Sequence, residues 1–228
     1  MHLKTTRASI ENLHFWLTIV VSLVGVCACS RTTLQSPTDT ISPGQSNLLF
    51  ADDFSNPSSG WDQETAEEGG TYYEDGAYHI VVNTPDLDIF ANPYMSFKDV
   101  RVEVEAVKVA GEDHNNFGIL CRYQGKNDYY VGMVSSDGYY GILKVKGGEE
   151  HLLGRESMQQ SQVILGENAR NVLRLDCIGS ELHLFVNGML LETQQDADFI
   201  EGDVGLLAGA YQNPGVHIAF DNFKVLQP

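Results

Sequence analysis

The stretch 116–145 constrains the fold most, because it holds three apolar segments separated only by short turns. The segments are Phe117–Tyr123, Tyr129–Ser135 and Tyr139–Val145, and they are rich in the aromatic and branched residues typical of β-strands. The second turn contains Asp137-Gly138, which supplies the positive-φ positions of a tight hairpin. The stretch therefore predicts three consecutive antiparallel strands.

The second of these strands is apolar on both faces. Side chains alternate across a strand, so Tyr130 and Val134 lie on one side and Tyr129, Val131 and Met133 on the other. A strand covered on one side only alternates apolar with polar residues. The second face is therefore either covered by other parts of the chain or a binding surface.

The rest of the chain after residue 46 shows more short strands with turns between them. Residues 100–109 alternate strictly, and Asn187-Gly188 is a strong hairpin signal. No apolar stripe of period 3.6 continues for ten residues beyond the apolar run near the N-terminus. Two stretches, 83–93 and 147–162, are predicted to be connections. The pattern predicts an all-β fold, a two-sheet antiparallel sandwich of about a dozen strands.

The N-terminal segment has the features of an export signal. Lys4 and Arg7 precede the apolar run Phe15–Val26, which is shorter than the roughly 20 residues of a spanning helix. Small residues then lead to Cys29, and this resembles a bacterial lipobox, which implies cleavage before Cys29 and a diacyl anchor on it. Cleavage after Ala28 with simple secretion, and a retained membrane anchor, stay open as alternatives.

Three regions follow from this division of the chain. Residues 1–28 form the signal peptide, and residues 29–46 the lipidated cysteine with a flexible linker rich in Ser, Thr, Pro and Gln. Residues 47–228 form the folded domain. The localisation expected is extracytoplasmic, in a bacterial cell envelope, with the membrane reached through the lipid anchor only.

The cysteine count favours one disulfide. If Cys27 leaves with the signal and Cys29 carries the lipid, Cys121 and Cys177 remain as a pair in an oxidising compartment. Two buried free thiols are the alternative, because free cysteine packs well as a small hydrophobe.

The formal net charge of −17 excludes one class of partner. Such a surface repels phosphate backbones, so the sequence argues against nucleic-acid binding. The simplest interpretation is that the charge keeps an exported protein soluble.

Several short motifs together carry a resemblance to a known superfamily. They are Asp53-Phe54, Gly60-Trp61, Phe117-Gly118-Ile119, Tyr130 before Asp137-Gly138-Tyr139, Asn187-Gly188, Gly202–Leu206 and Phe220–Val225. Over residues 48–228 the chain resembles the concanavalin A-like lectin/glucanase superfamily, and within it laminin-G-like and 3-keto-disaccharide-hydrolase-type domains of bacterial envelope proteins. The resemblance implies a jelly-roll sandwich with paired first and last strands. It also implies one concave sheet, of a kind often used to bind glycans or proteins.

No catalytic residues are predicted. Glucanases of this superfamily carry Glu-x-Asp-x-Glu on one strand, whereas here Glu103 and Glu105 are followed by Val107. Two acids on a solvent face are usually only a polar face, and no serine elbow or His-Glu-x-x-His motif is present.

A structural calcium is the one cofactor considered, since related sandwiches often hold calcium near the paired terminal strands. Asp53 and Asp221 are the candidate ligands, with Asp52 beside them. These carboxylates would serve equally well as turn caps.

The candidate ligand-binding residues are Arg122, Tyr129, Val131, Met133 and Tyr139. Tyrosine rings stack on sugar rings, and an arginine beside them bonds a hydroxyl or carboxylate. Aromatic residues also fill sandwich cores, and for Trp61 the core is the favoured interpretation.

The function predicted is a non-catalytic binding domain that recognises a glycan or an envelope protein through one face of the sandwich. A glycan-cleaving hydrolase whose acids come from separate strands is the alternative, and a purely structural envelope module is a third. Carboxylates that face each other in a cleft would favour the enzyme, whereas an aromatic sheet without acids would favour binding. The oligomeric state is not predicted.

Overall fold

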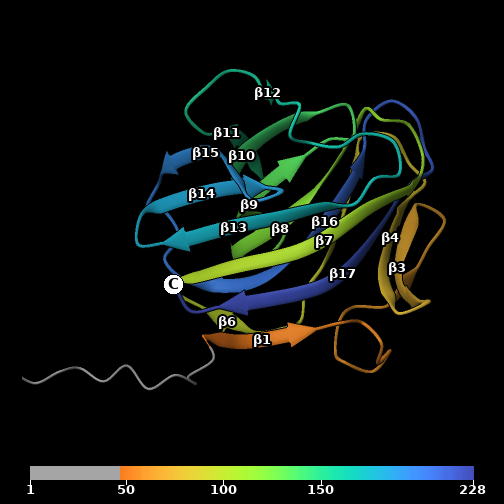
Figure 1. Ribbon diagram of the computed structural model, residues 1–228, viewed down its shortest axis with the longest axis horizontal. Helices are drawn as coiled ribbons and strands as arrows, with labels where there is room; N and C mark the ends of the chain where they lie inside the picture. Colours follow the sequence, from red (N-terminus) through yellow and green to blue (C-terminus); the bar gives the residue numbers. More distant parts are fainter. Residues whose placement is uncertain (1–46) are drawn as a thin grey trace, which may run out of the picture. The chain divides into compact units, whose positions relative to one another are not determined.

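Two antiparallel β-sheets form the fold in the computed structural model, which describes residues 47–228 (Figure 1). No helix occurs within these residues, so the all-β jelly-roll prediction is confirmed. The strands are β1 Leu48–Asp52, β2 Glu64–Thr65, β3 Gly69–Glu74, β4 Ala77–Val82, β5 Leu87–Ala91, β6 Ser96–Phe97, β7 Val100–Ala110, β8 Asn115–Tyr123, β9 Asp128–Val134, β10 Tyr139–Lys146, β11 Glu149–Leu152, β12 Gln159–Gln160, β13 Asn171–Ile178, β14 Glu181–Val186, β15 Met189–Gln195, β16 Gly202–Ala210 and β17 Val216–Leu226.

The strand order defines the two sheets. Sheet A runs β15-β14-β13-β7-β17-β4-β3-β2, with β1 also paired to β17. Sheet B runs β11-β10-β9-β8-β16-β5, with β12 on β10 and β6 on β16. The chain therefore passes repeatedly between the sheets, and β5 and β11 lie at opposite edges of sheet B.

The three central strands lie where the sequence predicts them, as β8, β9 and β10 side by side in sheet B. Both turns close with a backbone hydrogen bond, from Asp128 to Gly125 at 3.0 Å and from Gly138 to Ser135 at 3.0 Å. Sheet B is therefore organised around this meander.

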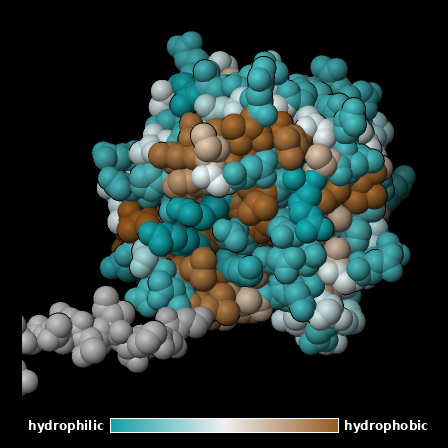
Figure 2. All heavy atoms as spheres, viewed as in Figure 1, coloured by the Kyte–Doolittle hydropathy of each residue, from teal (hydrophilic) through white to brown (hydrophobic). Residues whose placement is uncertain are grey.

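The terminal strands pair as the resemblance implies. Phe50 lies opposite Val225 and Ala51 opposite Lys224 in the β1–β17 ladder. Strand β7, between β17 and β13, alternates buried and half-buried residues as predicted, with Arg101, Glu103 and Glu105 at half-buried positions. Hydrophilic side chains cover most of the face seen in Figure 2, with apolar patches between them.

Two predicted connections are wrong, because each contains strands. Residues 83–93 include β5, and residues 147–162 include β11 and β12. Strand β5 is short and contains Asp88, while β11 is almost wholly polar. Edge strands are held by backbone pairing to one neighbour, so their sequences need little apolar content.

The apolar side chains form two clusters, one on each face of sheet B. The larger fills the space between the sheets and contains Tyr130 and Val134. The smaller lies on the outer face and contains Leu120, Tyr129, Val131, Met133, Val145 and Leu207. The second apolar face predicted from the sequence is therefore real, and much of it is covered by its own neighbours.

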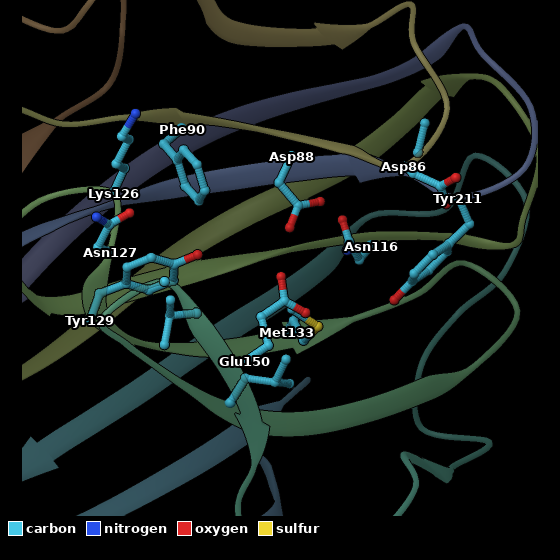
Figure 3. Close-up of a pocket in the computed structure, with 14 residues that line it drawn as sticks. Asp86, Asp88, Phe90, Asn116, Lys126, Asn127, Tyr129, Met133, Glu150 and Tyr211 are labelled. Atoms are coloured by element: carbon cyan, nitrogen blue, oxygen red, sulfur yellow. The ribbon is translucent and has the colours of Figure 1, made fainter.

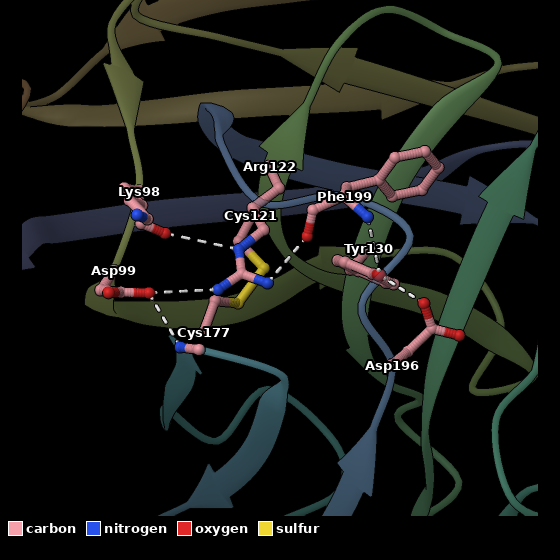
Figure 4. Close-up of a disulfide and its surroundings, with 9 residues drawn as sticks. Lys98, Asp99, Cys121, Arg122, Tyr130, Cys177, Asp196 and Phe199 are labelled. Carbon is pink, nitrogen blue, oxygen red and sulfur yellow. Dashed lines mark hydrogen bonds and ion pairs between the residues drawn. A yellow bond between two sulfur atoms is a disulfide. The ribbon is translucent and has the colours of Figure 1, made fainter.

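A disulfide between Cys121 and Cys177 joins the two sheets (Figure 4). Cys121 lies on β8 of sheet B and Cys177 on β13 of sheet A, with both side chains fully buried. The predicted pair is confirmed, and the alternative of two free thiols is wrong.

The predicted signal peptide, Cys29 and the linker to residue 46 lie outside the described residues. Among residues 47–228, no helix has the length and apolarity needed to cross a membrane.

We expect loss of the disulfide to lower stability substantially. The bridge closes a loop of 56 residues, and loop-closure entropy for that length corresponds to about 4 kcal/mol. A Cys121→Ala/Cys177→Ala double variant should therefore unfold roughly 10 °C below the unmodified protein. Thermal unfolding followed by circular dichroism without reductant measures the difference. Equal midpoints for the two proteins would contradict the expected role of the bridge.

Candidate functional site

The outer face of sheet B carries a hollow of about 450 Å3, which we call the sheet B pocket (Figure 3). This volume lies within the ~300–1,000 Å3 typical of small-molecule sites. The lining residues are Asp86, Asp88, Phe90, Asn116, Lys126, Asn127, Tyr129, Met133, Leu143, Val145, Gly148, Glu150, Ala210 and Tyr211. Strands β5, β8, β9, β10 and β11 all contribute to the pocket.

One cross-strand row places a polar pair in the pocket. Asp88 on β5 and Asn116 on β8 both lie opposite Gly209 on the strand between them, β16. A Cβ atom at Gly209 would overlap Oδ1 of both side chains. The absence of a side chain at residue 209 therefore lets the two polar groups lean together over the middle strand.

Asp88 is destabilised in its charged form. Burial raises the pKa of its carboxyl to about 6, against a hydrogen bond from Asn116 that lowers it and a smaller contribution from the charge of Glu150 that raises it. No ion pair within 4.0 Å reaches Asp88 in the described part of the chain. Asp88 is thus an acid without a counter-ion in a partly dry pocket.

Glu150 enters the pocket from the opposite edge of the sheet. It lies opposite Val145 on β10, which in turn lies opposite Tyr129 on β9. The carboxylates of Asp88 and Glu150 point toward one another across the pocket in Figure 3. The structure therefore brings together two acids from separate strands.

An aromatic cluster forms one end of the pocket. The rings of Phe90 and Tyr129 meet edge to face at 5.5 Å, and Tyr123 packs at 5.7 Å from Tyr129. Burial, and then the charges of Asp88 and Glu150, raises the pKa of the Tyr129 hydroxyl above its usual value. The pocket thus pairs an aromatic end with an acidic centre.

The structure places four of the five predicted binding residues on or near this face. Tyr129 and Met133 line the pocket, and Val131 is buried in the same apolar cluster. Tyr139, which is 39% exposed, lines an adjoining hollow of about 190 Å3. Tyr211 borders both hollows.

Arg122 does not belong to this face. Its side chain is 1% exposed and its guanidinium donates to the Phe199 carbonyl at 2.8 Å and to Asp99 at 3.3 Å (Figure 4). The backbone φ of Arg122 is 51°, a left-handed value that is rare outside glycine. This local irregularity turns the side chain into the fold, where it fixes the segment before β16.

The polar residues at the centre of the pocket and beside the adjoining hollow were not identified from the sequence. They are Asp88, Asn116, Glu150 and Tyr211. Asp88 and Glu150 lie on the two edge strands that the sequence pattern assigned to connections. The alternation of Asp88 with Ile89 and Phe90 was the one sequence signal for a strand at this place. The prolines on either side of the stretch obscured that signal.

The predicted calcium ligands, Asp53 and Asp221, make local hydrogen bonds. Asp53 accepts hydrogen bonds from the backbone and hydroxyl of Ser55, and Asp221 accepts one from the backbone of Asn222. Residues 47–228 contain no group of three or more histidine, cysteine or acidic side chains arranged to hold a metal ion. These carboxylates act as turn caps, the alternative role that the sequence allowed for them.

Other residues considered from the sequence lie away from the pocket. Glu105 is on β7 of sheet A and pairs with Arg170 at 2.7 Å. Trp61 is buried in the core, where its ring meets Phe223 edge to face at 4.8 Å. The core interpretation of Trp61 is therefore correct.

We expect Asp88→Asn to stabilise the protein at neutral pH. The folded pKa of about 6 exceeds the ordinary aspartate value of 3.8, so the folded state binds the proton more tightly and loses stability as pH rises through this window. Removing the charge should add about 1–3 kcal/mol to the unfolding free energy near pH 8, and almost nothing near pH 4. Urea unfolding at both pH values measures this.

Asp86→Asn is the matched control, because Asp86 lines the same pocket. The control should leave the pH dependence of stability unchanged. An Asp88→Asn variant whose unfolding free energy has the same pH dependence as that of the unmodified protein would contradict the raised pKa of Asp88.

Comparisons with known proteins give similarity in structure only. No protein-family model matches the chain, and no curated protein matches its sequence. Among solved structures, carbohydrate-binding module CBM66 from Bacillus subtilis is 16% identical with a TM-score of 0.60, covering 73% of this chain and 95% of that one.

Two glucan-degrading enzymes are similar to a comparable degree. A Bacteroides ovatus GH16 enzyme from a mixed-linkage glucan locus, solved with its product, has 11% identity and a TM-score of 0.57 over 78% of this chain and 100% of that one. The catalytic domain of a Thermotoga petrophila laminarinase has 10% identity and a TM-score of 0.55, over 78% and 96%. Together with the strand topology, these similarities show that residues 47–228 have the concanavalin A-like sandwich fold.

Proposed function

We propose that this chain binds glycans in the sheet B pocket. The observation that carries the proposal is the combination of an aromatic end, Phe90 and Tyr129, with the polar groups of Asp88, Asn116 and Glu150 around one hollow. Sugars present an apolar ring face and a rim of hydroxyls. Aromatic rings cover the first, and fixed acceptors and donors bond the second.

Two of these polar groups, Asp88 and Asn116, are already held in place before any ligand arrives. Asn116 is 5% exposed, and the glycine between it and Asp88 sets the spacing of their side chains. Preorganised groups reduce the entropy lost on binding. The similarity to a carbohydrate-binding module and to two glucan-degrading enzymes supports a glycan as ligand, without naming which one.

A glycan-cleaving hydrolase is the second candidate, and the facing pair Asp88 and Glu150 favours it. Such enzymes use two carboxyl groups, one as the acid. Burial raises the pKa of Asp88 to about 6, which suits a proton donor to the leaving oxygen. Glu150 would accept a proton from the water that attacks the anomeric carbon as the glycosidic bond breaks.

Binding without cleavage remains the stronger proposal because Glu150 is poorly fixed. It is exposed, on a four-residue polar edge strand, and no hydrogen bond to its side chain is found among residues 47–228. A catalytic base needs a rotamer locked by its surroundings.

We also propose that the protein acts outside the cytoplasm, anchored through lipid on Cys29. The disulfide between Cys121 and Cys177 supports an oxidising compartment. The signal-like segment before Cys29 supports export.

Gly209→Ala tests the binding site by geometry alone. The added methyl group would push Asp88 and Asn116 apart, and loss of one or two hydrogen bonds to a ligand should weaken binding about tenfold or more. A glycan array followed by calorimetry on the purified exported protein measures the affinity. Gly166→Ala is the control, because its Cβ would meet only the Ser136 carbonyl at 3.4 Å.

The outcomes separate the candidates. A protein that binds no glycan, or a Gly209→Ala variant with unchanged affinity, would rule out this pocket as a glycan site. Incubating every bound glycan with the protein and analysing the reducing ends tests cleavage. Products that disappear in both Asp88→Asn and Glu150→Gln would establish the hydrolase instead.

Acylation at Cys29 has its own test. The exported protein should carry the mass of a diacylglyceryl group and fractionate with membranes, whereas Cys29→Ala should be released or remain uncleaved. Intact-mass spectrometry and membrane fractionation measure both properties. A Cys29→Ala protein that is processed normally and stays on the membrane would refute the anchor.

A further inference from the structure

The charge of the sheet B pocket is unbalanced. Three carboxylates, from Asp86, Asp88 and Glu150, line it with a single cation, Lys126. None of these four side chains makes an ion pair within 4.0 Å in the described part of the chain. Figure 3 shows the Lys126 ammonium at the aromatic end, pointing away from the two facing carboxylates. The centre of the pocket therefore lacks a positive charge.

Asn116 independently indicates a missing hydrogen-bond donor. Its side chain is 5% exposed, yet its Oδ1 atom is buried with no hydrogen-bond partner. This oxygen and Oδ1 of Asp88 both lie over Gly209, so two acceptors are near neighbours. The Asn116 amide nitrogen donates to Asp88, which leaves the Asn116 oxygen without a donor of its own. Buried acceptors without partners are rare and call for an explanation.

We propose that the sheet B pocket recognises sugars that carry a protonated amino group, with the ammonium held between Asp88, Asn116 and Glu150. This inference rests on the proposed glycan-binding function and narrows it to amino sugars. An ammonium group offers three donors and no acceptor, which matches three converging oxygen acceptors better than a hydroxyl does. The same charge pairs with the two carboxylates.

The rest of the pocket suits the remainder of such a sugar. The half-buried Phe90 ring is available to the apolar face of the pyranose, and the buried Tyr129 ring supports it from behind, edge to face at 5.5 Å. Uronic acids and phosphorylated sugars would be repelled by the carboxylates. The raised pKa of Asp88 fits a carboxylate that lacks the cation its site is shaped for.

A matched set of oligosaccharides tests the proposal. Calorimetry with the purified exported protein should compare glucosamine and galactosamine oligomers with N-acetylated and neutral oligomers of the same length and linkage. The salt should be about 0.15 M, where charges farther than ~8 Å are screened. We expect the free-amine form to bind at least tenfold more tightly than its matched partners, and EDTA to change nothing.

Two variants distinguish an effect of the pocket carboxylates from an effect of the protein's general negative charge. Glu150→Gln should reduce the preference for the amine severalfold, and Asp88→Asn should do the same. Glu149→Gln removes the same charge from the neighbouring residue, which does not line the pocket, and should leave the preference intact. Equal loss in Glu149→Gln would show a surface effect and overturn the proposal.

The other outcomes are also decisive. Equal or tighter binding of neutral or N-acetylated oligomers would overturn the amino-sugar inference while leaving glycan binding in place. Binding that EDTA abolishes would assign the acceptors to a divalent cation and likewise overturn it. No binding of any oligosaccharide would remove both the inference and the proposed function.

Discussion

The burial of sheet B on both faces is the constraint on which the rest of the structure depends. Its inner face packs against sheet A, while Leu120, Tyr129, Val131 and Met133 cover one another on the outer face. This apolar floor lowers the local dielectric for any polar group placed on it. The raised pKa of Asp88 is a direct result, because its carboxylate stands at the border of that floor.

Sheet B has a rigid centre, which holds the fold together, and polar edge strands, which supply the acids of the pocket. The Cys121–Cys177 bridge ties β8 to sheet A, and the buried guanidinium of Arg122 holds the segment before β16. The acids come instead from β5 and β11 at the two edges. Edge strands tolerate polar residues, so a site can be built there without disturbing the core. The pocket spans the sheet because its acidic residues lie on the two opposite edge strands.

The predictable and unpredictable parts of the site differ in their physical origin. Tyr129 and Met133 belong to a strand with apolar residues on both faces, and this pattern alone indicated a covered or binding face. Asp88 and Glu150 could not be found in this way. Their strands are short and polar, and they are held by ladder hydrogen bonds to β16 and β10, which leave no periodic signal.

The sequence by itself determined the all-β sandwich and the central meander, and it favoured the disulfide. Alternation and turn residues are local properties that a short stretch of chain displays, and the cysteine count needs only the composition of the chain. Only the tertiary structure decided which polar residues meet. Residues 88, 116, 150 and 209 converge through the strand order of sheet B and the space left by one missing side chain at Gly209. Contacts between distant segments depend on register and sheet order, which no local pattern records.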